Sequence, residues 1–416
     1  MRKGTGQGME YIKEIREIWA KQPETFPVFL EKNPEIFTKV DAAQKKENED
    51  LIEEISQKMR KKAQKRPKDE KERVQWEGEL EQEMKQFWGR ERILCLSEWM
   101  SGELLDAFER ETKNFIGRIR EFDETLEPEQ IWQAMRNYFI YAMIVEMQGE
   151  EQNADDPILA YSLLYPYTDN YIDDEKISGE EKARYNRMIG QKLKGEAAEP
   201  GNLLEEKTCR LLDMILDTYE GEAKNKVAFT LLQLLEAQSC SIGQMKQGIE
   251  EERILEISIW KGGSSVLADY LFATADWREW EEAFYLKFGF MLQLVDDLQD
   301  IEEDGRAGSH TLMTNAAKEK RLEGQVNRLL WFIWSEIEAF VPRNPGLKGF
   351  VLKNCVGISL LSAVTIGCSG GGFLSKEYIR ALEPYLPVSA EFIKRMKVQK
   401  KRERYAVFRD KRETET

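Results

Sequence analysis

Residues 288–304 read FGFMLQLVDDLQDIEED and change from apolar to strongly acidic along the stretch. A helix turns by about 100° per residue, so residues three or four apart share a face. Asp296, Asp300 and Asp304 have i, i+4, i+8 spacing, and Asp297 shares a face with the last two. Like charges at this spacing repel, and the preceding run is too apolar for a freely solvated helix. The stretch therefore predicts a metal-binding stripe at the rim of an apolar cavity. Whether Asp296 or Asp297 is the first ligand stays open.

The scarcity of histidine narrows the kind of metal that such a stripe can bind. The chain has 76 acidic residues but only one histidine, His310. Hydrolase mechanisms that depend on histidine, and zinc sites with several histidines, are therefore disfavoured. A metal held mainly by carboxylate and amide oxygens is more often magnesium than zinc or iron. The sequence thus points to Mg²⁺.

The overall composition argues against several classes of protein. A net charge of −15 disfavours binding to nucleic acid, which needs clustered Lys and Arg. Residues 1–19 lack the apolar core of a secretory signal, and the longest apolar run, 356–368, is short for a bilayer span and predicts a buried helix. We therefore expect a cytoplasmic protein with reduced thiols at its five scattered cysteines, Cys95, Cys209, Cys240, Cys355 and Cys368.

Helical periodicity runs through the whole chain, whereas alternating strand patterns are almost absent. We expect an all-α fold with a charged helical N-terminal extension over 1–90, a core-forming domain over 91–390 and a basic tail over 391–416. The extension is expected to be solvated, or else to act as a docking or dimerisation arm. The tail has ten Lys and Arg between Lys394 and Arg412. It is expected to be a solvated helix, with peripheral contact to an anionic membrane surface as the alternative.

A second apolar run that ends in carboxylates covers residues 157–174. Asp169 and Asp173 stand four residues apart, so a helix would place both on one face, and Asn170 adds an amide oxygen. In a chain this acidic, such a pair also occurs by chance. The pair alone therefore does not establish a second metal-binding stripe.

Two basic positions could contact an anion. Two glycines follow Lys261 inside a helical pattern and indicate that the helix ends there or that two backbones approach closely. Lys261 would present its ammonium to an anion, or would only interact with the negative end of its helix. Arg306 lies in a glycine-rich turn after the acidic stretch, where it either is solvated or closes over a metal-bound phosphate.

Taken together, these segments resemble the class I isoprenoid synthase superfamily of trans-prenyl diphosphate synthases, squalene and phytoene synthases and class I terpene synthases. Residues 169–173 resemble its first acidic motif, with Asn at a position that is often Asp, and residues 293–300 resemble its second, with the leading Gln. Gly243-Gln244 and Lys261-Gly262 match, in order and approximate spacing, the segments between the motifs. The resemblance covers roughly residues 95–375. It implies a helical bundle in which the motifs face each other across a deep apolar cavity.

The resemblance, combined with the spacing, implies a function and a set of site residues. The expected enzyme is a Mg²⁺-dependent terpene synthase that ionises an allylic prenyl diphosphate, with several ions per site and, as is common in these families, a homodimer. The expected metal ligands are Asp169, Asp173, Asp296, Asp297, Asp300 and Asp304. The expected contacts to the substrate come from Lys261, Arg306, Gln293, Gln244 and Asn170. The expected catalytic residues are Asp169, Asp173, Asp296, Asp297, Asp300 and Lys261.

Two other functions remain open. One is prenyl transfer, either chain elongation or head-to-head coupling. Elongating enzymes have an arginine pair soon after the first motif, whereas Asp174-Glu175-Lys176 follows it here. The Asn-Ser-Glu triad of ordinary terpene cyclases is also missing, which makes the chain similar to the large bacterial class IB terpene synthases. The second of these two other functions is that of an inactive helical isoprenoid-binding protein, because Asn170 stands in the first motif at a position that is often Asp.

Overall fold

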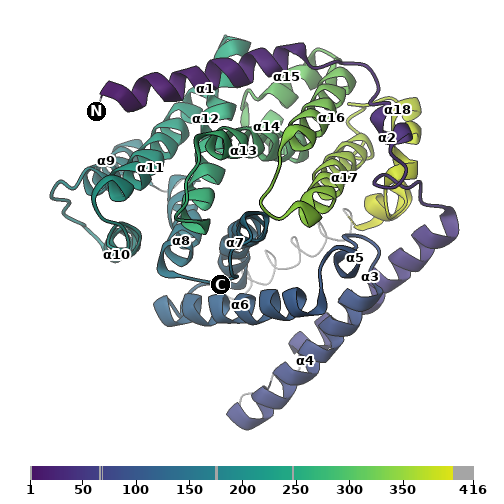
Figure 1. The fold of residues 1–416 in the computed structure, drawn as a ribbon, viewed down its shortest axis with the longest axis horizontal. Helices are drawn as coiled ribbons and strands as arrows, with labels where there is room; N and C mark the ends of the chain where they lie inside the picture. Colours follow the sequence, from purple (N-terminus) through teal and green to yellow (C-terminus); the bar gives the residue numbers. More distant parts are fainter. Residues whose placement is uncertain (1, 65–66, 68, 174–176, 246–247, 397–416) are drawn as a thin grey trace, which may run out of the picture.

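The structure is a computed structural model, which describes residues 2–64, 67, 69–173, 177–245 and 248–396 (Figure 1). Every regular element among these residues is a helix, so the expected all-α fold is confirmed. In chain order the elements are α1 (Arg2–Lys21), α2 (Phe29–Lys32), α3 (Ala42–Gln64), α4 (Glu70–Arg90), α5 (Leu96–Trp99), α6 (Gly102–Phe122), α7 (Pro128–Gln148), α8 (Asp156–Asp173), α9 (Gly179–Leu193), α10 (Leu203–Leu216), α11 (Gly221–Ser241), η1 (Ile242–Met245), α12 (Glu251–Ala273), α13 (Glu279–Gln299), α14 (Ile301–Ala307), α15 (Leu312–Lys318), α16 (Leu322–Ala339), η2 (Pro345–Leu347), α17 (Lys348–Gly367), α18 (Lys376–Leu382) and η3 (Glu383–Tyr385).

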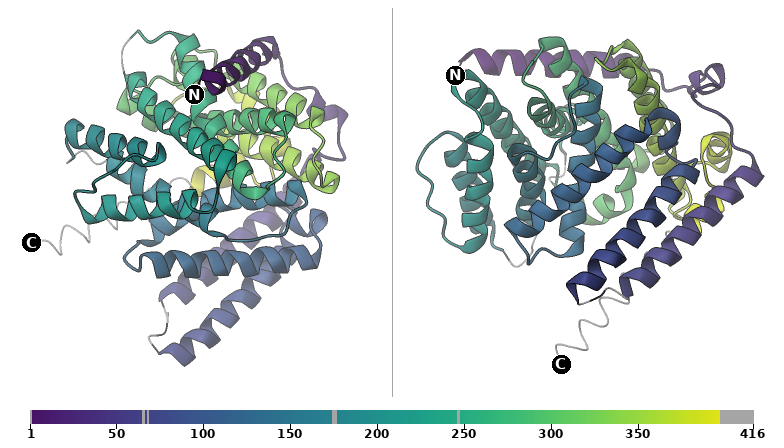
Figure 2. Two further views of the ribbon diagram at one scale, coloured as in Figure 1. Left: turned by 60° about the vertical axis from the view of Figure 1, so that its left-hand side comes forward. Right: turned by 60° about the horizontal axis from the view of Figure 1, so that its bottom comes forward.

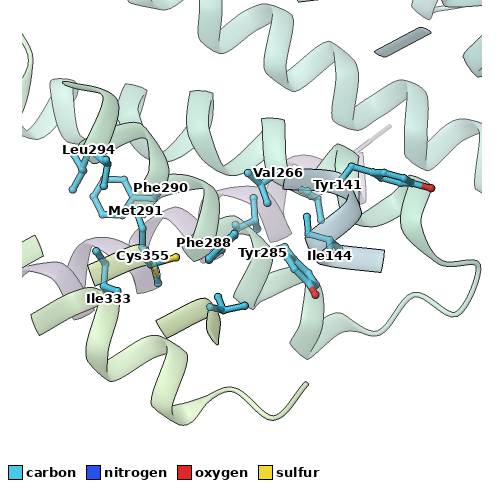
Figure 3. Packing of buried hydrophobic residues seen from close by; sticks show 14 of the residues in the cluster. Tyr141, Ile144, Val266, Tyr285, Phe288, Phe290, Met291, Leu294, Ile333 and Cys355 are labelled. Carbon is cyan, nitrogen blue, oxygen red and sulfur yellow. The ribbon is translucent and has the colours of Figure 1, made fainter. Parts of the chain in front are cut away.

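Two helices near the centre of the molecule, α12 and α13, organise the fold. They pack along each other more extensively than any other pair of described elements; α7, α11 and α1 also contact α12, and α15, α16 and α17 contact α13. Side chains from these helices meet in one buried cluster that includes Tyr141, Val266, Phe288, Phe290 and Ile333 (Figure 3). Because α13 is enclosed by several helices, it is apolar around most of its circumference until the acidic stretch begins.

The first helix contributes to this core. Ile12, Ile15 and Trp19 have i, i+3, i+7 spacing, and all three are buried. The Trp19 ring packs edge-on against Phe290 and Phe332, with ring centroids 5.4 and 5.7 Å away. The expectation of a solvated extension is therefore wrong for this part of the chain. The domain boundary near residue 90 stays a prediction.

The next two long helices, α3 and α4, form a hairpin that projects from the body of the molecule (Figure 1 and Figure 2). Lys58 of α3 and Glu83 of α4 form an ion pair of 2.8 Å across the hairpin. At its base, the Lys45 ammonium donates to the carbonyl oxygen of Glu383 over 2.7 Å, and the Asn48 amide donates to that of Pro387 over 2.8 Å. The hairpin is thus anchored to the C-terminal part of the chain by buried polar contacts.

The apolar run near the C-terminus forms most of α17. The run over residues 356–368 was expected to be too short to span a bilayer, whereas the helical segment Pro345–Gly367 is long and apolar enough to cross a membrane by length and composition. The share of its most apolar window buried inside the protein is 61%, and α17 packs against α13 and α16, as expected for a core helix. Residues 397–416, most of the basic tail, lie outside the described residues, and the expected membrane contact stays a prediction.

Candidate functional site

The second acidic stretch lies at the junction of two helices. Asp296 and Asp297 are in the last turn of α13, and Asp304 is in α14. Asp300 separates the helices with φ −100° and ψ 11°, and its N–H still donates to the carbonyl oxygen of Asp296 over 3.0 Å. The irregularity is therefore local, and the predicted stacking of carboxylates along one side of the chain is retained.

All four carboxylates line one cavity of about 310 Å³. Asp297 is buried and Asp304 half-buried, whereas Asp296 and Asp300 are exposed. Among the described residues, the remaining lining comes from the end of α11, η1, α12, α13 and the loop before α15: Ser241, Gln244, Ile257, Ser258, Lys261, Gln293, Ser309 and Thr311. The structure thus brings together seven of the residues that the sequence singles out. Nearly all lining side chains are polar, so the deep apolar cavity of the resemblance stays a prediction.

Lys261 reaches this cavity because two helices cross at glycines. Gly262 lies directly beside Gly289, so a Cβ atom added to Gly262 would be 2.7 Å from the Cβ of Gln293 and closer still to the Gly289 carbonyl oxygen. Of the two readings of Gly262 and Gly263, the close backbone approach is confirmed. The expected end of the helix at these glycines is wrong, because α12 continues without interruption to Ala273.

Burial and neighbouring negative charges raise the pKa values of three carboxyl groups in the cavity. Burial, reinforced by the neighbouring Asp296, raises the pKa of Asp297 to about 7, although the Gln293 amide donates to its Oδ1 over 2.8 Å. Loss of water contact and the same neighbour raise the pKa of Asp300 and of Asp304 to about 6. The positive charge of Lys261 acts in the opposite direction on Asp297 and Asp304. The one lysine is thus outnumbered by four carboxylates, and a bound cation would offset their excess negative charge.

The donor set fits magnesium, although the described residues form no preassembled cage. The carboxylates offer the oxygen ligands that Mg²⁺ prefers, and Asp297 Oδ2 is buried without a hydrogen-bond partner. Within the described part of the chain, no group of three or more His, Cys, Asp or Glu is arranged to hold one ion. An ion here would be bound by one or two of these carboxylates together with water and ligand oxygens, which is the usual coordination of Mg²⁺ in proteins.

Asp169 and Asn170 of the first acidic stretch lie on a different helix, α8, and are not among the described residues that line this cavity. Asp169 is near the end of α8, where its Oδ1 accepts from the Gln238 amide over 2.9 Å and its Oδ2 from the Gln133 amide over 3.4 Å. The Asn170 amide donates to the carbonyl oxygen of Pro166 over 2.7 Å within the same helix. Asp173 is the last residue of α8, and its side chain lies outside the described part of the structure.

Gln244 and Arg306 differ from their expected surroundings. Gln244 lines the cavity, but its side-chain amide donates to the backbone carbonyl oxygen of His310 over 3.1 Å. In return, the backbone carbonyl oxygen of Gln244 accepts from the backbone N–H of His310 over 3.0 Å. This pairing holds the loop with Ser309 and Thr311 against the cavity. Arg306 lies in the last turn of α14, not in a loop; it is exposed and is not among the cavity-lining residues.

Three features of the site could not be assigned from sequence. Ser258 lies one turn before Lys261 on α12 and lines the cavity. Deeper along α12, Asp269 is fully buried, accepts from the Asn137 amide over 3.1 Å and has a pKa raised by burial. Arg136 of α7 is exposed, and its charge acts on Asp300. Polar residues inside the otherwise apolar pattern of α7 and α12 were the available signal, but the pattern did not say what they contact.

Comparison of the chain with protein-family models, with curated proteins and with solved structures finds no match. The function is therefore inferred from the residues of the site and from the resemblance of the two acidic motifs.

Proposed function

We propose that this protein is a Mg²⁺-dependent enzyme that ionises an allylic prenyl diphosphate, as class I terpene synthases do. The observation that supports the proposal best is one cavity that combines four carboxylates, one of them with a buried unpartnered oxygen, and the ammonium of Lys261. Carboxylates alone would suit a cation, and lysine alone would suit an anion. Their combination suits a divalent cation that is bound together with a phosphorylated ligand.

The proposed mechanism assigns separate tasks to the residues of the site. Asp296, Asp300 and Asp304 would hold the ions, with Asp297 behind them. When bound, Mg²⁺ neutralises charge on the diphosphate and makes it a better leaving group. Lys261 would donate a charge-assisted hydrogen bond to a phosphate oxygen and stabilise the charge that develops there. The aromatic and aliphatic side chains that precede the motif on α13 would contribute to keeping water away from the allylic cation.

Incubation of the protein with C10 to C25 prenyl diphosphates and Mg²⁺, followed by assay of released diphosphate, tests the proposal. We expect release from at least one of these substrates. Asp296→Ala and Asp169→Ala should each abolish release without loss of helical circular dichroism. Asp217→Ala is the matched control, because the Asp217 side chain is 75% exposed and far along the chain from either motif. Absence of release from every substrate by the folded wild-type protein would count against the enzyme.

The products distinguish the alternatives. Addition of isopentenyl diphosphate would yield a longer diphosphate if the enzyme elongates chains, and head-to-head coupling would yield a hydrocarbon with twice the carbon number. Stabilisation by Mg²⁺ and diphosphate without turnover would indicate a binding protein that retains the site but lacks the reaction.

A further inference from the structure

Two serine side chains of the acidic cavity have no hydrogen-bond partner among the described residues. Ser258 of α12 is only 3% exposed, and Ser309 in the loop before α15 is half-buried; both line the cavity. The two other hydroxyls of the described lining are engaged. Ser241 donates to a backbone carbonyl oxygen of α11 over 2.7 Å, and Thr311 accepts from a backbone N–H of α15 over 3.1 Å. Ser258 and Ser309 therefore present free hydroxyls to whatever enters the cavity.

The missing partner is unusual for a buried serine inside a helix. Thr230, Ser359 and Ser362 are similarly buried on other helices, and each donates to the carbonyl oxygen four residues earlier, over 3.1, 2.8 and 2.7 Å. Ser258 makes no such bond with the described part of α12. A buried hydroxyl without a partner costs free energy in the folded protein. This cost indicates that the hydroxyl of Ser258 serves a ligand.

The chemistry of the cavity indicates what that ligand group is. Lys261, one turn after Ser258 on α12, can only donate hydrogen bonds, whereas a serine oxygen also accepts them. The described residues form no cage of three or more ligands, so Mg²⁺ bound here would keep several of its waters. A water bound to a cation turns its hydrogens away from the ion and donates. The free hydroxyls are suited to accept from such waters.

We propose that Ser258 and Ser309 accept hydrogen bonds from waters bound to the ion in this cavity and thereby favour Mg²⁺ over Ca²⁺. Mg²⁺ gives up its waters reluctantly, whereas Ca²⁺ takes more direct ligands in a flexible geometry. The carboxylates of α13 and α14 would bind the ion, while the hydroxyls of α12 and of the loop before α15 hold its waters. The inference deepens the proposed function and depends on its metal site.

The test measures binding of the metal alone, so it does not depend on turnover. Mg²⁺ and Ca²⁺ are titrated by calorimetry near pH 8 into the full-length wild type, Ser258→Ala and Ser309→Ala. Ser362→Ala is the matched control, because it removes a buried helical hydroxyl that already has a partner in α17. Urea denaturation of the same proteins without metal measures whether the hydroxyls stabilise the fold.

We expect Ser258→Ala to weaken Mg²⁺ binding by about threefold to tenfold, the net contribution of one hydrogen bond. Ca²⁺ binding should weaken by less than about twofold, because fewer waters remain on this ion. Ser309→Ala should act in the same direction but less, since solvent water replaces a hydroxyl more easily at a half-buried position. Without metal, Ser258→Ala should unfold at a higher urea concentration than the wild type, because an unpaired buried hydroxyl is removed. Ser362→Ala should leave both affinities unchanged.

Three results would overturn the inference while the metal site stands: unchanged Mg²⁺ affinity in both variants, equal weakening of Mg²⁺ and Ca²⁺, or a metal-free Ser258→Ala that is less stable than the wild type. Ser309→Ala keeps the test valid if Ser258→Ala does not fold. A wild type that binds neither ion would refute the proposed function and the inference together. Selective Mg²⁺ binding as expected, without release of diphosphate from any prenyl diphosphate, would refute the enzyme and leave the inference standing.

Discussion

Substitution of Gly289 by alanine should disrupt the contact that positions Lys261 beside the acidic stretch. An alanine Cβ at this position would be 2.6 Å from the carbonyl carbon of Gly262 and 2.9 Å from the Cα of Gly263. These are backbone atoms inside helix α12, which cannot rotate away as the end of a side chain can. Helices α12 and α13 would have to separate, and the Lys261 ammonium would move away from Asp297.

The size of the effect follows from two opposing contributions. Forcing a methyl group into a packed contact costs about 1–3 kcal/mol and sometimes more. Alanine gains about 1 kcal/mol over glycine in helix propensity. Because the contacted atoms are rigid, we place the cost at or above the upper end, so Gly289→Ala should lower the free energy of unfolding by about 2 kcal/mol or more.

Urea denaturation followed by far-ultraviolet circular dichroism measures this change, and Gly357→Ala provides the control. Gly357 lies inside α17, where an added Cβ would meet nothing within 4 Å. Only the helix-propensity effect remains there, so Gly357→Ala should raise the free energy of unfolding by up to about 1 kcal/mol. If Gly289→Ala were as stable as Gly357→Ala, the close helix crossing would not exist as described, and the reasoning about Lys261 would fail with it.

Other predictions concern the charge of the cavity and the first helix. Since the pKa of Asp297 is raised to about 7 and that of Asp304 to about 6, ionisation of these groups destabilises the folded protein as pH rises from about 4 to about 7. Stabilisation by Mg²⁺, measured as a thermal shift, should accordingly be larger near pH 8 than near pH 5. Asp297→Asn should raise the unfolding temperature near pH 8 without Mg²⁺ and should reduce the Mg²⁺ shift; an unchanged shift would exclude Asp297 from the site. Trp19→Ala should cost about 3–5 kcal/mol of stability, whereas Trp132→Ala, at a side chain that is 56% exposed, should cost little; equal costs would contradict the burial of α1.

Part of the candidate site was predictable because it depends on local spacing. The i, i+4 positions of Asp296, Asp300 and Asp304 place them on one side of the chain whatever surrounds it, and all three line the cavity. Gly262 and Gly263 indicated a close approach or a break, and the structure selects the approach. The choice required a partner, Gly289, that is distant in sequence.

The first helix shows where local reasoning was insufficient. The composition of residues 1–90 is highly charged, and this average concealed the i, i+3, i+7 spacing of Ile12, Ile15 and Trp19. The stripe becomes a core element only because Phe290 of α13 and Phe332 of α16 offer an apolar surface to it. Burial of an apolar side chain is favourable only where another apolar surface covers it, and the sequence of one helix does not show which surface that is.

The sequence by itself determined the helical class of the protein, the acidic stretch at residues 288–304 and the scarcity of histidine that favours an oxygen-bound metal. Each depends on composition or on the fixed geometry of one helix. The tertiary structure alone decided that Asp297 is buried while Asp296 is exposed, that Gln244 holds the His310 loop, and that Arg136 acts on Asp300. Burial, hydrogen-bond partners and electrostatic neighbours depend on groups from other helices. Those groups can lie anywhere in the sequence, so local spacing does not reveal them.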